Sequence, residues 1–211
     1  MSQITSMLAC SLASFGGLAS GANILANGSF ELTAATTLGY GNNLNVVPDD
    51  WVFTPVSSDQ SNTVFVDGTG TYTAGPNNAF QGVNYVDISG DGHFSQSVVL
   101  SFDSNVTYGG WFSRRDTSSD VGFTSIWNAA NTALLYSSPA VSVPAGDPVG
   151  NWVSSFDTVF LPAGTYTFRV EMGNFANADD VSFSPEAVPE AASSVLGMLG
   201  MLTFTLRRRR L

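Results

Sequence analysis

The residue types of a hydrolase triad lie close together in residues 91–95, where Asp91, His93 and Ser95 include the only histidine of the chain. A triad is defined by hydrogen-bonded geometry in space, and closeness in sequence does not supply that geometry. A histidine that follows a glycine is typical of an exposed turn. We therefore expect His93 to be exposed and to take no part in catalysis.

Other catalytic signatures are missing from the sequence. The chain has no Gly-x-Ser-x-Gly elbow, no His-Glu-x-x-His zinc motif and no phosphate-binding loop. The adjacent carboxylates Asp49-Asp50 and Asp179-Asp180 could in principle form the acid pair of a glycosidase, but neighbouring side chains on a strand point to opposite faces. The sequence thus favours a non-enzymatic protein and leaves a glycan hydrolase as the less favoured alternative.

Short segments with hydrophobic residues at alternate positions recur along the chain between Gly, Pro, Asn or Asp residues, and this pattern predicts β-strands. They fall at residues 30–32, 51–53, 64–66, 85–88, 94–100, 107–113, 121–127, 153–160, 164–171 and 181–183. Lysine is absent and glutamate is rare, which also favours strands over helices. We expect an all-β fold, an antiparallel two-sheet jelly-roll β-sandwich.

The charge balance is strongly acidic, with 17 Asp and Glu residues, seven arginines and a net charge of −10 at pH 7. Such a surface repels nucleic acid, so nucleic-acid binding is excluded, while divalent cations are attracted to it. The single cysteine, Cys10, lies in the N-terminal segment. The body of the protein therefore has no disulfide and no thiolate metal site.

Both ends of the chain carry uncharged hydrophobic segments. Residues 1–22 end in the small residues 19–22, which predicts a signal peptide, although the usual basic start is missing. Residues 191–206 are followed by Arg207, Arg208, Arg209 and Arg210. As a helix this run would measure roughly 24 Å, less than the roughly 30 Å of the hydrocarbon core. We expect a short transmembrane helix that leaves the arginines in the cytoplasm and the body outside.

The C-terminal features, Pro189-Glu190, an uncharged run and an arginine cluster, resemble the PEP-CTERM sorting signal of bacterial surface proteins. The resemblance implies processing by an exosortase, which cuts near Pro-Glu and releases or re-attaches the protein outside. The usual Pro-Glu-Pro is Pro189-Glu190-Ala191 here, and a plain tail anchor is the alternative. The expected organisation is a signal peptide at 1–22, a sandwich domain at 23–187 and a sorting tail at 188–211.

The body resembles the galactose-binding-like sandwiches of carbohydrate-binding modules. The matching motifs are Asn27-Gly28-Ser29-Phe30-Glu31, Pro48-Asp49-Asp50-Trp51, residues 81–87, Ser95-Gln96, residues 162–166 and Asp179-Asp180-Val181-Ser182. The resemblance implies that the first and last strands lie side by side and that their carboxylates hold a structural calcium ion. Its ligands would be Glu31 and Asp180, with Asp179 as a substitute. The alternative is that all three are solvated turn residues.

Sugar rings stack on exposed aromatic side chains, and nearby polar groups bind their hydroxyls. The candidates for such a site are Tyr40, Tyr72, Trp111 and Trp127, and for any one of them a core or rim position is the alternative. Trp51 and Trp152 each begin a strand after a turn, so we expect both in the core.

Together these features predict an exported protein of the cell surface or extracellular matrix that passes through the inner membrane. We expect it to bind extracellular polysaccharide without catalysis. The alternative is a purely structural surface or matrix protein, whose acidic exterior provides hydration and binds no specific ligand.

Overall fold

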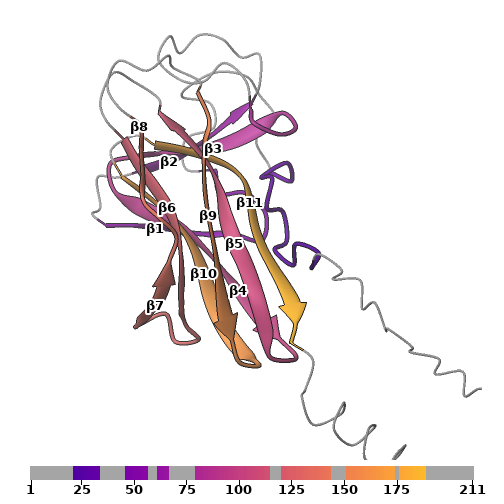
Figure 1. The fold of residues 1–211 in the computed structure, drawn as a ribbon. Coiled ribbons are helices and arrows are strands. Elements are labelled where there is room, and N and C mark those ends of the chain that lie inside the picture. The colour runs from indigo at the N-terminus through magenta and orange to yellow at the C-terminus, as the bar shows by residue number, and fades with distance from the viewer. Residues whose placement is uncertain are drawn as a thin grey trace, which may run out of the picture.

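The computed structural model describes residues 21–33, 46–56, 61–66, 79–114, 120–143, 151–173 and 176–188. In these ranges the strands form two sheets that pack face to face (Figure 1). Neighbouring strands pair antiparallel in both sheets. The predicted all-β, antiparallel two-sheet sandwich is confirmed.

One sheet, called the six-stranded sheet here, has the order β1-β4-β10-β6-β7, and β8 pairs with β6. Its strands are β1 (Val52–Pro55), β4 (Gly92–Leu100), β10 (Gly164–Gly173), β6 (Asp120–Asn128), β7 (Leu134–Ser137) and β8 (Val141–Val143). The other, called the five-stranded sheet, has the order β2-β3-β11-β5-β9. Its strands are β2 (Ser61–Val66), β3 (Asn84–Ser89), β11 (Ala176–Ala187), β5 (Ser104–Arg114) and β9 (Val153–Leu161).

The predicted strand segments from residue 51 onward all overlap observed strands. The segment at 30–32 is wrong, because Phe30 N donates to Asn27 O at 3.1 Å in a turn and both residues have positive φ, 58° and 52°. The prediction also missed β7 and β8. All four residues of β7 are exposed, so its sequence carries no alternation between a buried and an exposed face.

The hydrophobic core lies between the two sheets and is rich in aromatic rings. Phe30 is fully buried, with its ring centroid 5.3 Å from that of Trp51 and 6.2 Å from that of Phe94. Phe168 of β10 meets Phe183 of β11 across the sandwich at 5.9 Å. Each such side chain stabilises the fold by about 1.5–3 kcal/mol through burial. Trp51 is 6% exposed, so its predicted core position is confirmed.

The first described residues run beside the last strand. Ile24 N donates to Phe183 O at 3.0 Å, and Val181 N donates to Gly28 O at 2.9 Å. Asn23 Oδ1 accepts from Phe183 N at 3.0 Å. The two ends of the domain therefore lie side by side, as the resemblance implied. The described N-terminal segment forms turns there and no regular strand.

The predicted signal peptide at 1–22 and the predicted tail at 188–211 lie almost wholly outside the described residues. Pro189, Glu190 and the four arginines of the tail are among those left undescribed. Within the ranges that the structure does describe, no helix has the length and hydrophobicity to cross a membrane.

Candidate functional site

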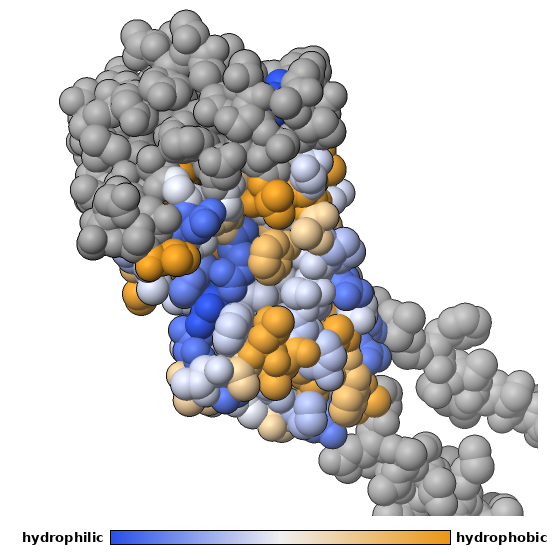
Figure 2. All heavy atoms as spheres, turned by 90° about the vertical axis from the view of Figure 1, so that its left-hand side faces the viewer, coloured by the Kyte–Doolittle hydropathy of each residue, from blue (hydrophilic) through white to orange (hydrophobic). Residues whose placement is uncertain are grey.

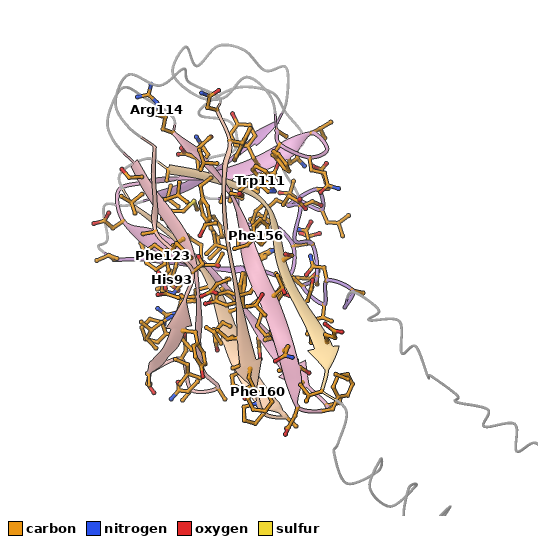
Figure 3. All side chains as sticks on the ribbon, in the orientation of Figure 1. His93, Trp111, Arg114, Phe123, Phe156 and Phe160 are labelled. Atoms are coloured by element: carbon orange, nitrogen blue, oxygen red, sulfur yellow. The ribbon has the colours of Figure 1, made fainter. Side chains whose placement is uncertain are left out.

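Five aromatic side chains gather on the outward side of the five-stranded sheet. Val106, Tyr108 and Phe112 of β5 lie in the core. Because neighbouring residues of a strand point to opposite faces, Trp111 points outward. The ring of Phe80 stacks on Trp111 with centroids 3.9 Å apart and planes 18° apart. Phe156 of β9 meets Trp111 edge-on at 6.5 Å. Figure 3 shows Trp111 and Phe156 in the same part of the sandwich.

Trp152 and Tyr85 extend the cluster toward β3. Trp152 meets Phe80 at 6.3 Å and Tyr85 at 5.8 Å, both edge-on. Tyr85 is buried, whereas Phe80 and Phe156 are 38% and 40% exposed. We call Phe80, Tyr85, Trp111, Trp152 and Phe156 the aromatic platform. The predicted core position of Trp152 is wrong, because its ring lies in this outward cluster.

The backbone of β5 permits the close packing of Phe156. Gly109 lies opposite Phe156 in the β5–β9 pairing. A Cβ atom at Gly109 would lie 2.1 Å from Ser155 O and 2.5 Å from Phe156 Cδ1. Any larger residue at this position would therefore push β9 and the ring of Phe156 away from the sheet.

Two carboxylates hold the loop that carries Phe80. Asp179 Oδ2 accepts a hydrogen bond from Gln81 N at 2.9 Å, and Asp179 lies directly opposite Trp111 in the β5–β11 pairing. Glu31 Oε1 accepts from Val83 N at 2.8 Å and from Asn84 N at 2.9 Å. Carboxylates that accept main-chain N–H groups form strong, charge-assisted bonds. The position of Phe80 over Trp111 thus depends on Asp179 and Glu31.

Burial dominates the titration of Asp179, which has no exposed surface. It raises the pKa of this carboxyl from 3.8 to about 7, and hydrogen bonds from the N–H groups of Gln81, Asp180 and Phe80 oppose the rise. Burial also raises the pKa of Asp180. Near neutral pH the charge that holds the loop is therefore sensitive to pH.

The three predicted calcium ligands are near the junction of the N-terminal segment and β11, and the carboxylates of Glu31 and Asp179 bind the main chain there. Glu31 Oε1 and both oxygens of Asp179 accept N–H donors, and Asp180 lies at a bulge with a φ of 44°. Among the described residues no three His, Cys, Asp or Glu side chains form a group that could hold a metal ion. Calcium binding stays a prediction, tested by comparing the melting temperature in calcium with that in EDTA.

A row of polar side chains crosses the same sheet beside the platform. Asn177 of β11 lies opposite Asp87 of β3 and Ser113 of β5, and its Nδ2 donates to Ser113 Oγ at 3.2 Å. All three residues are 0–1% exposed. The platform is therefore bordered by polar groups that the sheet fixes in place.

Trp127 lies on the opposite outer face, in the six-stranded sheet. The guanidinium of Arg169 sits 3.7 Å from the centroid of the Trp127 ring, and Trp127 Nε1 donates to Ser125 Oγ at 2.9 Å. Ser125 Oγ in turn donates to Glu171 Oε1 at 2.8 Å. The structure therefore separates Trp111 from Trp127, and the indole N–H and one ring face of Trp127 already have partners.

His93 belongs to the same outer face as Trp127, because Glu171, which lies opposite His93, also accepts from the Ser125 hydroxyl that binds the Trp127 indole. Figure 3 shows His93 beside Phe123. The histidine lies opposite Glu171 in the β4–β10 pairing, its Nδ1 is 3.8 Å from Glu171 Oε2, and its side chain is only 12% exposed. Burial lowers the pKa of His93, against the attraction of Glu171. The predicted exposure of His93 is wrong, because β4 already begins at Gly92 and includes His93. Ser95 Oγ donates to Val52 O at 3.4 Å, so the described contacts give no triad.

Figure 2 views the side of the molecule on which β6 and β7 lie and shows a hydrophilic band next to hydrophobic patches. The exposed large hydrophobic residues of these two strands are Val121, Leu134, Leu135 and Tyr136. They stand apart from the stacked rings on the other sheet, and no ring contact joins them to Trp127 among the contacts described here.

The sequence identified one platform residue, Trp111, among the four candidates. Tyr40 and Tyr72 lie outside the described residues. Phe80 was missed because it lies in a loop without alternation. Phe156 stands between Ser155 and Asp157 in β9, so alternation would have placed its ring on the core face, and the sequence carries no signal for its outward position.

No family model and no curated protein matches the chain. Among solved structures, the K2 cleaved adhesin domain of Lys-gingipain is similar with a TM-score of 0.49 and 19% identity, over 74% of this chain and 96% of that one. TmCBM61, solved in complex with β-1,4-galactotriose, gives 0.44 and 15%, over 78% and 99%. The MgGH51 α-L-arabinofuranosidase gives 0.47 and 14%, over 81% of this chain and 27% of that enzyme, so this chain spans about a quarter of its length. These likenesses concern the fold alone.

Proposed function

We propose that the protein binds carbohydrate through the aromatic platform and does so without catalysis. The observation that carries the proposal is the stacked pair of Phe80 and Trp111, in which Phe80 is 38% exposed and lies at the outer end of the stack. The C–H faces of a sugar ring pack on such a ring, and neighbouring polar groups take its hydroxyls. Extracellular polysaccharide is the ligand class that fits.

The charges near the platform favour a neutral polysaccharide over an anionic one. The described charged groups next to its rings are the carboxylates of Glu31, Asp87 and Asp179. Of the two described arginines, Arg169 is engaged on the other sheet by Asn131 and Glu171, and Arg114, at the end of β5, is only 3% exposed. An anionic chain would meet like charge at the platform and be repelled.

The same carboxylates support a non-catalytic role. Glu31 and Asp179 each accept main-chain N–H groups, so their oxygens are turned into the protein to hold a loop. A glycosidase needs two carboxyl groups that face the scissile bond. These two carboxylates position an aromatic ring instead.

We further propose that the domain is exported and acts at the cell surface or in the matrix, after a transient stage in the inner membrane and processing by an exosortase. This rests on the sequence of residues 1–22 and of the tail with Pro189, Glu190 and Arg207–Arg210. Replacing the four arginines with serine should leave the protein in the membrane in the wrong orientation or unprocessed. Cell fractionation and the mass of the mature chain measure both effects.

The binding proposal is tested by affinity electrophoresis of the purified full chain in gels that contain neutral polysaccharides or anionic alginate. Trp111→Ala should weaken retention about tenfold, equivalent to about 1.4 kcal/mol. Trp127→Ala is the matched control, because it removes the same ring from the opposite face, and its retention should match the unmodified protein. Equal loss in both variants would contradict the platform, and no retention in any gel would favour a structural coat protein.

A further inference from the structure

The chain leaves the sandwich at the end where three connections meet. These are the turn at residues 101–103 between β4 and β5, the turn at 162–163 between β9 and β10, and the end of β11 (Figure 1). Asp103 joins them, because its main-chain oxygen accepts from Val188 N at 3.0 Å and its Oδ1 accepts from Ala163 N at 2.8 Å. We call this the exit end.

Large hydrophobic side chains are exposed at the exit end. Phe102, in the β4–β5 turn, is 51% exposed, and Val99, one residue before the end of β4, is 65% exposed. Phe160 is 48% exposed and lies opposite Asn105, one residue from the start of β5. Figure 3 shows Phe160 at this end of the sandwich, away from Trp111. Because Val98, Leu100 and Leu161 face the core, Val99 and Phe160 point to opposite outer faces of the sandwich. We call Val99, Phe102 and Phe160 together the apolar rim of the exit end.

The sequence after Val188 restricts what can lie against this rim. Pro189 and Glu190 alone separate Val188 from the uncharged run at 191–206. Three Cα steps of at most ~3.6 Å bring the start of that run within roughly 11 Å of Val188. When the run lies in a bilayer, the exit end must therefore lie at the membrane surface.

We propose that the exit end is a membrane-contacting face, on which Phe102 and Phe160 enter the headgroup region of the bilayer while residues 191–206 are inserted. Aromatic and aliphatic side chains enter this region because apolar area is removed from water. The partner is a bilayer of low negative charge, because the carboxylates of Asp103 and Glu186 lie at the same end and would be repelled by anionic headgroups.

This orientation keeps the aromatic platform clear of the membrane. Trp111 lies seven residues along β5 from Ser104, at the exit end, and a rise of about 3.3 Å per residue separates them by roughly 23 Å. The contact would thus hold the sandwich upright on the membrane with its platform exposed. The proposal rests on the proposed membrane stage of residues 191–206 and does not depend on what the platform binds.

The test uses the full chain with Cys10→Ser, reconstituted into phosphatidylcholine vesicles, and a nitroxide spin label on one introduced cysteine. Labels at Phe102→Cys and Phe160→Cys should be more accessible to oxygen and less accessible to a nickel chelate than the label at a control position. The control is Val56→Cys, since Val56 is 73% exposed and its N–H binds Asp91 O beside the opposite end of β4.

Three outcomes would overturn the proposal. The labels at 102 and 160 could be as accessible to the nickel chelate as the label at 56, or the chain could fail to float with the vesicles. Addition of anionic phosphatidylglycerol should reduce the oxygen preference at 102 and 160, and an unchanged preference would contradict the stated lipid class. Circular dichroism of each labelled variant shows that the sandwich is intact.

Discussion

The two outer faces of the sandwich each present a tryptophan from a central part of the fold, but the two rings have different surroundings. Trp111 is stacked against Phe80 and flanked by Phe156, and the loop that carries Phe80 is held by the buried carboxylate of Asp179 and by Glu31. Trp127 lies under Arg169, in a network that includes Ser125 and Glu171. One ring belongs to an aromatic surface and the other to a closed set of polar contacts.

The difference shows that an outward aromatic residue is not by itself a binding platform. The indole of Trp127 has already committed its N–H and a π face to internal partners, so a ligand would have to replace them. The stack at Trp111 has committed no hydrogen bond among the contacts described, and its outer member is exposed. The partners of a ring therefore decide its role more than its exposure does.

The largest expected effect concerns the buried carboxylate behind the platform. Because the pKa of Asp179 is raised to about 7 in the folded state, the folded protein binds more protons than the unfolded chain between pH 4 and 7, and stability falls as pH rises through this range. The loss should approach roughly 4 kcal/mol. Urea unfolding of the native protein and of Asp179→Asn at several pH values measures it. A difference that does not change with pH would contradict the role of Asp179.

The next effect compares a glycine in a close contact of the five-stranded sheet with a glycine at an open position of the six-stranded sheet. Gly109→Ala should lower the free energy of unfolding by about 2–3 kcal/mol, because the new methyl group meets Ser155 O and Phe156. Gly164→Ala in β10 is the matched control, since its nearest atoms lie at 3.5 Å or more, and should cost less than about 1 kcal/mol. If denaturant titrations gave the same loss of unfolding free energy for both variants, the close packing of β5 and β9 would not contribute to stability.

A smaller effect is expected on the outer face of the six-stranded sheet, where a substitution should change stability and leave polysaccharide binding unchanged. Arg169→Ala removes the contacts of the guanidinium with Trp127, Glu171 and Asn131 and should lower stability by about 1–2 kcal/mol. Retention by polysaccharide should not change, because the network is remote from the platform. Arg169→Lys keeps the charge and should recover part of the stability. Weaker polysaccharide binding in Arg169→Ala would contradict the assignment of binding to the platform face alone.

The smallest effect has a pH dependence opposite in sign to that of Asp179. Burial lowers the pKa of His93 below 6.5, so the unfolded chain binds more protons as pH falls below that value and the folded state loses stability. Relative to His93→Gln, the native protein should therefore become less stable on acidification from neutral pH. Thermal unfolding of both proteins between pH 5 and pH 7 measures the sign, and a constant difference would contradict it.

Much of the fold could be predicted because strands leave a local signature. Alternation in residues 94–100, 107–113 and 164–171 identified β4, β5 and β10, and glycine and proline positions separated them. The failures had local causes as well. Residues 30–32 alternate but form a turn with positive φ at Phe30, and β7 was missed because both of its faces are exposed.

The site was less predictable because its members come from distant parts of the chain. Trp111 was identified as an aromatic candidate, but nothing in the sequence places Phe80 upon it. Trp152 was expected in the core because it starts a strand, yet its partners are Phe80 and Tyr85 on the outer face. The carboxylates of Glu31 and Asp179 were predicted as calcium ligands, and their described contacts are with main-chain N–H groups.

The sequence by itself determined the class of the fold, the acidic charge and which residues of each strand share a face, because the two-residue period of a strand and the net charge are properties of the local chain. Tertiary structure decided which strands pair and in which register. That pairing placed Asp179 beside Trp111 and Glu171 beside His93. Trp111 and Trp127 lie on opposite outer faces because β5 and β6 belong to different sheets. Which sheet a strand joins depends on the burial of the whole core and not on any single strand.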